Sequence, residues 1–494
     1  MPTDNWVNAE RPETQPGFSL QLNGQTLFDR KRMPNPFRNL PSVNQLLESD
    51  RLKKMVETVN HSVVANGVRD FLDDLREQVS QATEEVTIPT PGEIADSIAN
   101  WLEKEQTPSL RPVINGTGVL LHTGLGRAPL AEQAVAAVSE MSTGYASVEL
   151  DLASGDRGQR LRAVENLLCE LTGAEAACVT NNNAAATMIT LSAMAAGQEV
   201  IVSRGQLIEI GGSYRLPEVM ECSNAVLREV GTTNKTRGSD YANAINEQTG
   251  ALLKVHPSNY VVMGFSETPG IEEMVKIGRQ HDLPVIDDVG SGALVDFGKY
   301  GLKDEPVVQE SIHAGADLVL FSGDKLVGGP QCGIIVGRKK LVDQIIRDPL
   351  MRAFRVGKMT LAALQATLML YRKPDQAEIH IPLLRMLSTP VDNLKLRGDR
   401  IAGQINHLVF IKNASSESAQ SMLGGGSLPT QHLDSWAVVI EPEGLSVDEL
   451  AAKLRHSSPS LIGRVQNDRL HIDLRTVNPS QDIELVQLLE NLET

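Results

Sequence analysis

One lysine stands where its amine could do covalent chemistry. Lys325 lies in the segment Phe321-Ser322-Gly323-Asp324-Lys325-Leu326-Val327-Gly328-Gly329-Pro330, a glycine-rich loop that follows an apolar run. A lysine amine can form an imine with an aldehyde, and its surroundings can tune its pKa. Ser322 could add a hydrogen bond to a phosphate. Because most lysines are solvated surface residues, Lys325 needs supporting residues before it predicts a site.

An aspartate at the end of another apolar run could supply such support. Asp288 stands in Val285-Ile286-Asp287-Asp288-Val289-Gly290. Burying an unpaired carboxylate is costly, so Asp288 needs a partner. A protonated pyridine nitrogen is one candidate, and a metal ion or a turn is the alternative. Asp287 is the weaker choice, because consecutive strand residues point to opposite faces.

A third polar group follows an apolar run and opens a helical pattern. Its residues are Asn181, Asn182, Asn183 and Ala184, followed by further small residues up to Thr187. A helix N-terminus with small side chains exposes backbone N–H groups that can bind a phosphate. The alternative is an asparagine that only caps the helix.

The elements that must position these groups alternate between strand and helix from about residue 112 to 375. A helix is expected around Val164–Leu171, capped by Gly173. Short apolar runs separated by helices predict a mainly parallel sheet covered on both faces. The expected strands are Ala177–Thr180, Val200–Val202, Leu252–Val255, Val285–Asp287, Leu318–Phe321 and Ile334–Val336.

The order of these groups along the chain is informative. Ligands bind at the carboxyl ends of strands in open α/β sheets, so the three groups should meet at one sheet edge. A phosphate cradle, then a strand-end aspartate, then a strand-end lysine is the order of fold-type I enzymes that use pyridoxal 5'-phosphate (PLP). We therefore predict an α/β fold of that type, with PLP held by Lys325.

Three further regions flank the predicted PLP domain at 112–375. Residues 1–40 are polar and rich in proline, and predict a flexible tail. Residues 41–105 predict a small helical domain, with an apolar stripe that includes Val68, Leu72 and Leu75. Residues 380–494 predict a smaller α+β domain, with a loop at Gly424–Gly426.

Composition excludes several other classes of protein. The formal net charge of -16 argues against a broad basic surface for nucleic acid. The four cysteines lack the spacing of a zinc site, so no metal or disulfide framework is expected. No signal peptide and no apolar run near the ~18 residues of a membrane span are visible, which favours the cytoplasm and no membrane partner.

The chain resembles a known family from about residue 40 to its C-terminus. The segment Ser322–Gln331 closely resembles the cofactor-lysine motif of the bacterial selenocysteine synthases, the L-seryl-tRNA(Sec) selenium transferases. One departure is Gly124, where that family usually has Asn in the loop before Arg127. Other typical stretches are Val119–Arg127, Cys178–Asn183, Ser203–Gln206, Glu209–Gly212, Val230–Asn234, Ile462–Arg464 and Asp473–Arg475.

The resemblance implies a reaction and its partners. A seryl group esterified to tRNA(Sec) would replace Lys325 on PLP, lose its α-proton and β-hydroxyl, and pass through an aminoacrylyl intermediate. Selenophosphate would then donate selenium, giving selenocysteinyl-tRNA(Sec). The helical domain at 41–105 would hold the tRNA. A homo-oligomer is also implied, a homodecamer built as a ring of dimers.

The resemblance also implies roles for four further residues. Asp324 would be a catalytic neighbour of Lys325, and Arg127, Arg352 and Arg355 would lie on the selenophosphate side. Guanidinium groups suit phosphate oxyanions. The i, i+3 spacing of Arg352 and Arg355 predicts that they share one helix face; without the resemblance, a solvated basic face would be the better interpretation.

Two other functions remain as alternatives. A PLP-dependent lyase or desulfurase acting on a free amino acid would need the cofactor lysine but no helical domain at 41–105. A tRNA-binding protein without activity would be expected to lack Lys325 or Asp288, and both are present.

Overall fold

The chain divides into two structural units at the boundary between Arg111 and Pro112. The structure is a computed structural model that describes residues 40–81, 89–106, 108–212 and 214–492. The tail predicted for residues 1–40 lies outside this range except for Leu40, and the side chains of several residues at helix ends are also outside it. Among the described residues, no helix combines the length and apolar character needed to span a membrane.

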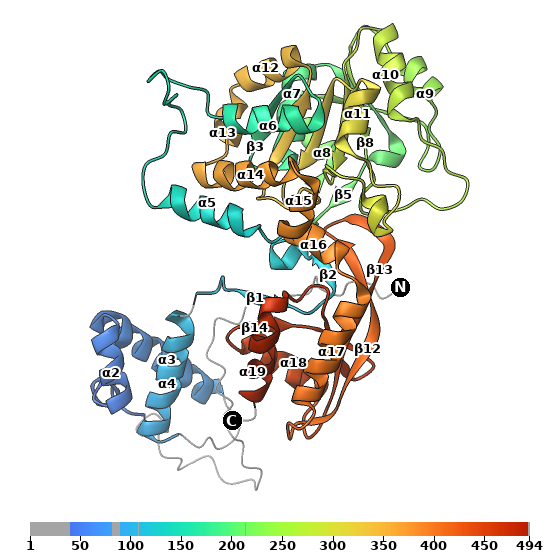
Figure 1. Cartoon of the computed structure of the whole chain (residues 1–494). Helices are drawn as coiled ribbons and strands as arrows, with labels where there is room; N and C mark the ends of the chain where they lie inside the picture. Colours follow the sequence, from blue (N-terminus) through green and yellow to red (C-terminus); the bar gives the residue numbers. More distant parts are fainter. Residues whose placement is uncertain (1–39, 82–88, 107, 213, 493–494) are drawn as a thin grey trace. The chain divides into compact units, whose positions relative to one another are not determined.

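The first unit is helical. Its core is formed by apolar side chains that recur at helical spacing, among them Leu52, Val68 and Leu72, which are fully buried. The hydroxyl of Ser49 caps the second helix by accepting from the backbone N–H of Leu52. The helices are α1 (Val43–Leu47), α2 (Asp50–Thr58), α3 (His61–Gln81) and α4 (Pro91–Gln106) (Figure 1).

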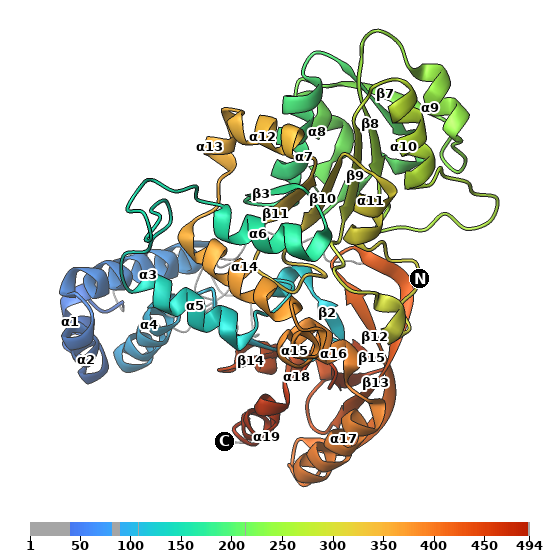
Figure 2. The same ribbon diagram turned by 45° about the horizontal axis from the view of Figure 1, so that its top comes forward.

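The second unit contains a seven-stranded sheet with the order β3-β11-β10-β9-β8-β4-β7 (Figure 2). Neighbouring strands are parallel except where β11 pairs with β10 and β3. The prediction of a mainly parallel sheet is confirmed. The strands are β3 (Ala176–Thr180), β4 (Glu199–Ser203), β7 (Val226–Val230), β8 (Thr249–Val255), β9 (Val285–Gly290), β10 (Leu318–Ser322) and β11 (Gly333–Gly337).

Helices cover both faces of this sheet because its central strands are apolar on both sides. In β10, Val319 and Phe321 pack in one hydrophobic cluster with residues of α6 and α14, whereas Leu318 and Leu320 pack in another with α7 and α12 (Figure 2). The predicted cap of α6 at Gly173 is confirmed, with φ 77°. The α-helices of this part of the chain are α5 (Glu132–Ser142), α6 (Arg162–Thr172), α7 (Asn183–Ala195), α8 (Leu216–Cys222), α9 (Gly238–Ala244), α10 (Ile271–Gln280), α11 (Val308–Ala314), α12 (Lys339–Arg347), α13 (Leu350–Phe354) and α14 (Lys358–Tyr371).

The C-terminal part of this unit is built on a second sheet, with the order β15-β16-β13-β12-β2. The loop expected at Gly424–Gly426 joins the long hairpin strands β12 and β13. The elements of this part are α15 (Pro374–His380), α16 (Pro382–Ser388), α17 (Val391–Ile405), β12 (Ile411–Gly424), β13 (Ser427–Pro442), α18 (Val447–His456), β14 (Ser460–Ile462), β15 (Arg464–Gln466), β16 (Arg469–Asp473) and α19 (Asp482–Glu490).

Two short strands from the start of the second unit also join the C-terminal strands. β1 (Val113–Asn115) pairs with β14, and β2 (Val119–Leu121) pairs with β12, both in parallel. The sequence-based division placed residues 112–121 with the large domain, because the strands are too short to reveal a partner about 300 residues away. The chain therefore joins the C-terminal strands before it enters the domain with the seven-stranded sheet.

The turn between these strands is fixed by C-terminal residues. Gly118 has φ 73° and its N–H donates to the Thr476 hydroxyl at 3.1 Å. A Cβ at this position would lie 2.3 Å from Oδ2 of the buried Asp473, so only glycine fits. Asp473 also accepts from the hydroxyls of Ser421 and Ser435, at 3.0 and 2.6 Å. These contacts hold the segment that leads into the loop before Arg127.

Candidate active site

Lys325 is buried in the loop that follows β10. This loop lies at the sheet edge where the parallel strands β8, β9 and β10 end. Only 5% of its surface is exposed. Burial lowers the pKa of its amine, and the positive charge of Arg127 lowers it further, while nearby carboxylates act in the opposite direction. A buried amine with a lowered pKa has a larger neutral fraction, which is the form that attacks an aldehyde.

Asp288 lies near Lys325 at the end of β9 and is also buried. Its Oδ1 accepts from the side-chain amide of Asn183, and its Oδ2 accepts from the hydroxyl of Thr187, both at 2.9 Å. Burial raises the pKa of Asp288, although these two hydrogen bonds and Lys325 oppose the rise. The carboxyl group is therefore fixed in orientation but would gain from a cationic partner.

Asp287 has different partners, as expected for neighbouring positions on a strand. Its carboxylate accepts from the hydroxyl of Ser311 at 2.7 Å and pairs with Lys254 at 3.3 Å. The carboxylate of Asp287 therefore has both a hydrogen-bond donor and a cation as partners within the fold. Asp288 is consequently the better of the two candidates for contact with a cofactor.

The N-terminus of α7 lies next to Asp288, since Asn183 is its first residue. Asn182 caps the helix by accepting from the backbone N–H of Ala185 at 2.8 Å. In the described part of the chain, no hydrogen bond uses the backbone N–H of Asn183 or Ala184, and Oδ1 of Asn183 is buried without a partner. The side chain of Asn183 thus supports Asp288, while the backbone N–H groups are left for an anion.

Arg127 and Asp324 form an ion pair beside Lys325, with 2.9 Å between the nitrogen and oxygen. Arg127 has φ 62°, an uncommon backbone conformation for a residue with a side chain. Its N–H donates to the carbonyl of His122 at 3.0 Å, which closes the loop. Gly124, the departure from the family pattern, lies in the short helix Thr123–Leu125, where an added Cβ would come 3.3 Å from the His122 ring. A side chain at position 124 would therefore be in close contact with the ring of His122.

The prediction that Arg352 and Arg355 share one helix face is wrong. Arg352 lies in the last turn of α13, but that helix ends at Phe354, and Arg355 has an extended backbone. The reason is a tertiary contact: Arg355 forms a β-bridge with Thr180, and the N–H of Asn181 donates to the carbonyl of Phe354 at 2.8 Å. This bridge brings Arg355 to the segment that opens α7. Among the described residues, neither arginine forms an ion pair.

Several residues of the site were not predicted. Thr187 was named only as the end of a motif, and its hydroxyl binds Asp288. Glu305 is buried, its Oε1 is hydrogen bonded to the hydroxyl of Ser291, and it interacts electrostatically with Lys325. His256 donates its backbone N–H to the carbonyl of Asp288 at 2.9 Å. Periodicity could not reveal these contacts, because each joins segments that are far apart in the sequence.

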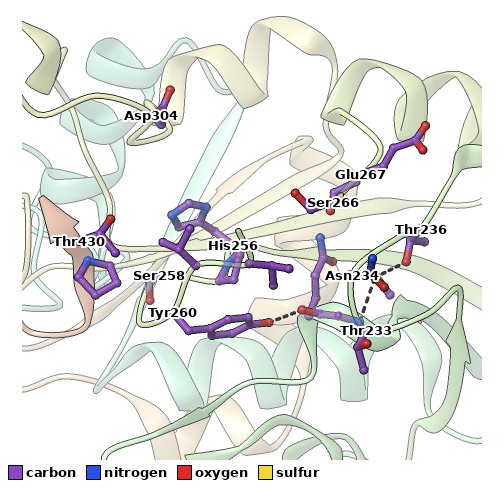
Figure 3. A pocket seen from close by; sticks show the side chains of 18 of the residues that line it. Thr233, Asn234, Thr236, His256, Ser258, Tyr260, Ser266, Glu267, Asp304 and Thr430 are labelled. Atoms are coloured by element: carbon purple, nitrogen blue, oxygen red, sulfur yellow. Dashed lines mark hydrogen bonds between the residues drawn. The ribbon is translucent and has the colours of Figure 1, made fainter. Parts of the chain in front are cut away.

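A pocket of about 300 Å³ adjoins the site at His256 (Figure 3). Burial lowers the pKa of His256 to about 4, so its ring is neutral near pH 7. The hydroxyl of Tyr260 donates to the carbonyl of Gly205 in the pocket wall. The lining is rich in hydroxyl and amide groups and includes no lysine or arginine among the described residues. Such a lining suits a hydroxylated neutral group better than a phosphate.

The arrangement could hold a small aldehyde that carries a phosphate and a basic ring nitrogen. Lys325 would bind the aldehyde, Asp288 the ring nitrogen, and the N-terminus of α7 the phosphate. Ser322, at the end of β10, is buried beside Lys325 in the same loop. The unpartnered N–H groups of α7 and the raised pKa of Asp288 are the observations that fit such a group.

Comparisons with known proteins agree on one family. The model of the L-seryl-tRNA selenium transferases matches residues 113–478, and the model of the selenocysteine synthase N-terminal region matches residues 37–76. The L-seryl-tRNA(Sec) selenium transferase of Carboxydothermus hydrogenoformans is 47% identical over 92% of this chain and 97% of its own length. That of Geobacter sulfurreducens is 44% identical over 92% and 99%. Among solved structures, a D-glucosaminate-6-phosphate ammonia-lyase has a TM-score of 0.54 at 21% identity and covers 78% of this chain and 99% of its own, which supports a shared fold.

Proposed function

The chain belongs to the family of L-seryl-tRNA selenium transferases, and from this premise we propose how its residues convert seryl-tRNA(Sec) to selenocysteinyl-tRNA(Sec). The observation that carries the proposal is the family match over residues 113–478, because that range contains every element of the candidate active site. The enzyme class is that of a PLP-dependent transferase.

PLP is the cofactor that we propose for this site. Lys325 would hold its aldehyde carbon, Asp288 its ring nitrogen, and the N–H groups of Asn183 and Ala184 its phosphate, with Ser322 as a further donor. When bound, PLP supplies an electron-accepting ring that allows a seryl group to lose its α-proton and then its β-hydroxyl. The side chain of Asn182 caps α7, and the backbone N–H of Asn181 binds the carbonyl of Phe354, so both residues support the start of the proposed phosphate site.

The residues around Lys325 have separate tasks in this proposal. Asp288 keeps a proton on the ring nitrogen, and its orientation is fixed by Asn183 and Thr187. The neutral amine of Lys325, once displaced by the amine of the seryl group, takes the proton from the seryl α-carbon. Asp324 fixes Arg127 by an ion pair and so holds one guanidinium group beside Lys325.

Selenophosphate is the selenium donor that we propose. Three arginines could bind its phosphate: Arg127, Arg352 and Arg355. The bridge between Arg355 and Thr180 supports this role, because it holds one of these arginines at the end of β3, immediately before the proposed PLP phosphate site. The hydroxyl-rich pocket at His256 lacks cations and is a poorer site for this anion.

The helical unit that contains α1–α4 is proposed to bind tRNA(Sec). One support is the family model that matches residues 37–76. The other is that every residue of the proposed PLP site lies in the second unit. The formal charge of -16 favours recognition of tRNA shape by local contacts over a broad basic surface. The homodecameric ring of dimers and the cytoplasmic location remain proposals that rest on the resemblance.

The test is a conversion assay with purified protein, PLP, seryl-tRNA(Sec) and selenophosphate. Selenium should appear on the tRNA in an alkali-labile aminoacyl bond. Free L-serine and free L-cysteine serve as matched substrates for the alternative, a lyase or desulfurase. Turnover of a free amino acid without conversion of seryl-tRNA(Sec) would favour that alternative.

A further inference from the structure

Glu305 is a buried carboxylic acid close to the catalytic lysine that the proposed mechanism does not use. It lies in the loop that leads from Leu302 to α11, and only 8% of its surface is exposed. Its Oε1 is hydrogen bonded to the hydroxyl of Ser291, and its Oε2 is buried without a partner. Burying an ionised carboxylate with an unpartnered oxygen is costly. Ionisation of Glu305 therefore costs free energy unless a nearby positive charge compensates it.

The hydrogen bonds of Ser291 indicate where the proton lies. Its hydroxyl is within bonding distance of two acceptors, Oε1 of Glu305 and the carbonyl of Val289, the latter at 3.1 Å. A hydroxyl has one hydrogen and can donate to one of them. Both bonds can form only when Glu305 carries a proton and donates it to Ser291. Burial also raises the pKa of Glu305 to about 7, which brings both protonation states within reach near neutral pH.

Ser291 connects this acid to the loop of Lys325. The backbone N–H of Leu326 donates to the carbonyl of Ser291 at 3.1 Å. The ionisable groups that interact with Lys325 are Arg127, Asp288, Asp324, Glu305 and His256. His256 in turn faces Lys254 and Asp287.

The other two acids that face Lys325 have partners. Asp324 is paired with Arg127. Both oxygens of Asp288 accept hydrogen bonds, and in the proposed function Asp288 pairs with the ring nitrogen of PLP. Among the described residues, Glu305 is thus the acid near Lys325 that has neither an ion pair nor a role in the proposed function. It is free to change its charge when the charge of the lysine changes.

We propose that Glu305 is a positioning residue that shares a proton with Lys325: the carboxyl group is protonated while the lysine amine is neutral, and ionised when the lysine becomes an ammonium. The two states contain the same atoms, so the exchange needs no other proton donor. Lys325 is neutral when it attacks; when the carboxyl proton of Glu305 moves to its amine, the carboxylate that remains stabilises the ammonium. The proposal rests on the proposed role of Lys325 as the PLP lysine.

The test uses the intact protein with PLP bound and does not depend on turnover. The visible absorbance is titrated with pH in wild type, in Glu305→Gln and in Asp304→Asn. Asp304 is the matched control, because it is the adjacent acid but is exposed. Loss of a negative charge near Lys325 should lower the pH midpoint of the absorbance by about half a unit or more in Glu305→Gln. Asp304→Asn should leave the midpoint within about 0.2 units, as expected for an exposed charge.

Thermal unfolding gives a second measurement with a fixed sign. The pKa of Glu305 in the folded protein, about 7, lies above the ~4.3 of an unfolded chain. The stability contributed by its protonated form is therefore complete below the unfolded pKa and is lost as pH rises toward 7. Glu305→Gln cannot lose a proton, so its unfolding temperature should rise relative to wild type between pH 5 and pH 8.

The outcomes separate this inference from the proposed function. If wild type shows no visible absorbance that depends on Lys325, the PLP assignment itself fails. If the absorbance is present but Glu305→Gln and Asp304→Asn have the same midpoint as wild type, the shared proton is refuted while the PLP assignment stands. Equal shifts in both variants would indicate a general charge effect and would also refute it.

Discussion

At the scale of single residues, Lys325 is the position on which the proposed chemistry depends. Lys325→Ala should lose the visible imine absorbance and the site of borohydride labelling, because no other amine occupies the end of β10. Lys339→Ala is the control, since Lys339 is an exposed lysine on α12. The measurements are an absorbance spectrum and peptide mapping after reduction. Labelling of any other lysine in the wild-type protein would contradict the assignment.

The two neighbouring aspartates allow a second test at this scale. Asp288→Asn should slow exchange of the seryl α-proton by about 100-fold, because an amide cannot hold the ring nitrogen protonated and charge develops there. Asp287→Asn should instead lower the unfolding temperature by several degrees, since Lys254 and Ser311 lose their partner. Both are measured by isotope exchange and thermal denaturation. The same exchange rate in the two variants would mean that the wrong aspartate was chosen.

The residues that the sequence predicted are those that a local pattern can identify. Lys325 and Asp288 follow apolar runs that form β10 and β9. The supporting contacts were not predicted: Thr187 and Asn183 reach Asp288 across 101 and 105 positions of the sequence. The periodic pattern of apolar residues gives no information about contacts between residues so far apart in the sequence. The same is true of Glu305, which looks like an ordinary surface acid until its burial is known.

At the scale of elements, the end of α13 has a consequence for the selenium donor. Because Arg355 is extended and bridged to Thr180, it and Arg352 approach an anion from two different backbone segments. Replacing either by Gln should raise the KM for selenophosphate by about 10-fold or more, the effect of losing a charge-assisted hydrogen bond. Binding of tRNA(Sec) should not change.

Arg347→Gln is the matched control for this prediction. Arg347 is an exposed arginine in the last turn of α12, and the residues that form the bridge with β3 do not include it. Its replacement should leave the KM for selenophosphate unchanged. Selenium incorporation at varied donor concentration and a gel shift with tRNA(Sec) supply the two readouts. An equal rise of the KM in Arg347→Gln would indicate a general effect of surface charge.

The sequence predicted the elements better than their ends. Strands β3, β4, β8, β9, β10 and β11 lie where apolar runs were found, because buried strands are apolar on both faces. The helix expected to carry both Arg352 and Arg355 stops at Phe354, since the bridge to Thr180 competes with helical hydrogen bonding. A tertiary contact of this kind leaves no local signal.

At the scale of the whole molecule, the boundary at Arg111 and Pro112 separates two functions in the proposal. Removal of residues 1–105 should leave the visible PLP absorbance intact, because every candidate cofactor residue lies after residue 112. Conversion of seryl-tRNA(Sec) should fall by orders of magnitude, since remote binding positions the seryl group and positioning can contribute about 7–11 kcal/mol. Absorbance, gel shift and selenium incorporation measure the three properties. Near-normal conversion by the shortened chain would favour an enzyme that acts on free amino acids.

The bond between the N–H of Gly118 and the hydroxyl of Thr476 joins residues 358 positions apart in the chain. On a ribosome that adds about 5–20 residues per second, this interval corresponds to roughly 20–70 seconds. β2 is made at the start of that time, whereas its partner β12 is complete only at Gly424, and Asp473, which packs against the turn at Gly118, follows later still. The segment that leads into the loop with Arg127 therefore lacks its contacts with Asp473 and Thr476 until synthesis is nearly complete. Nascent chains stopped before Asp473 should be cut by protease in this loop, whereas finished chains should resist, so that maturation of the active site is timed by the last residues to be translated.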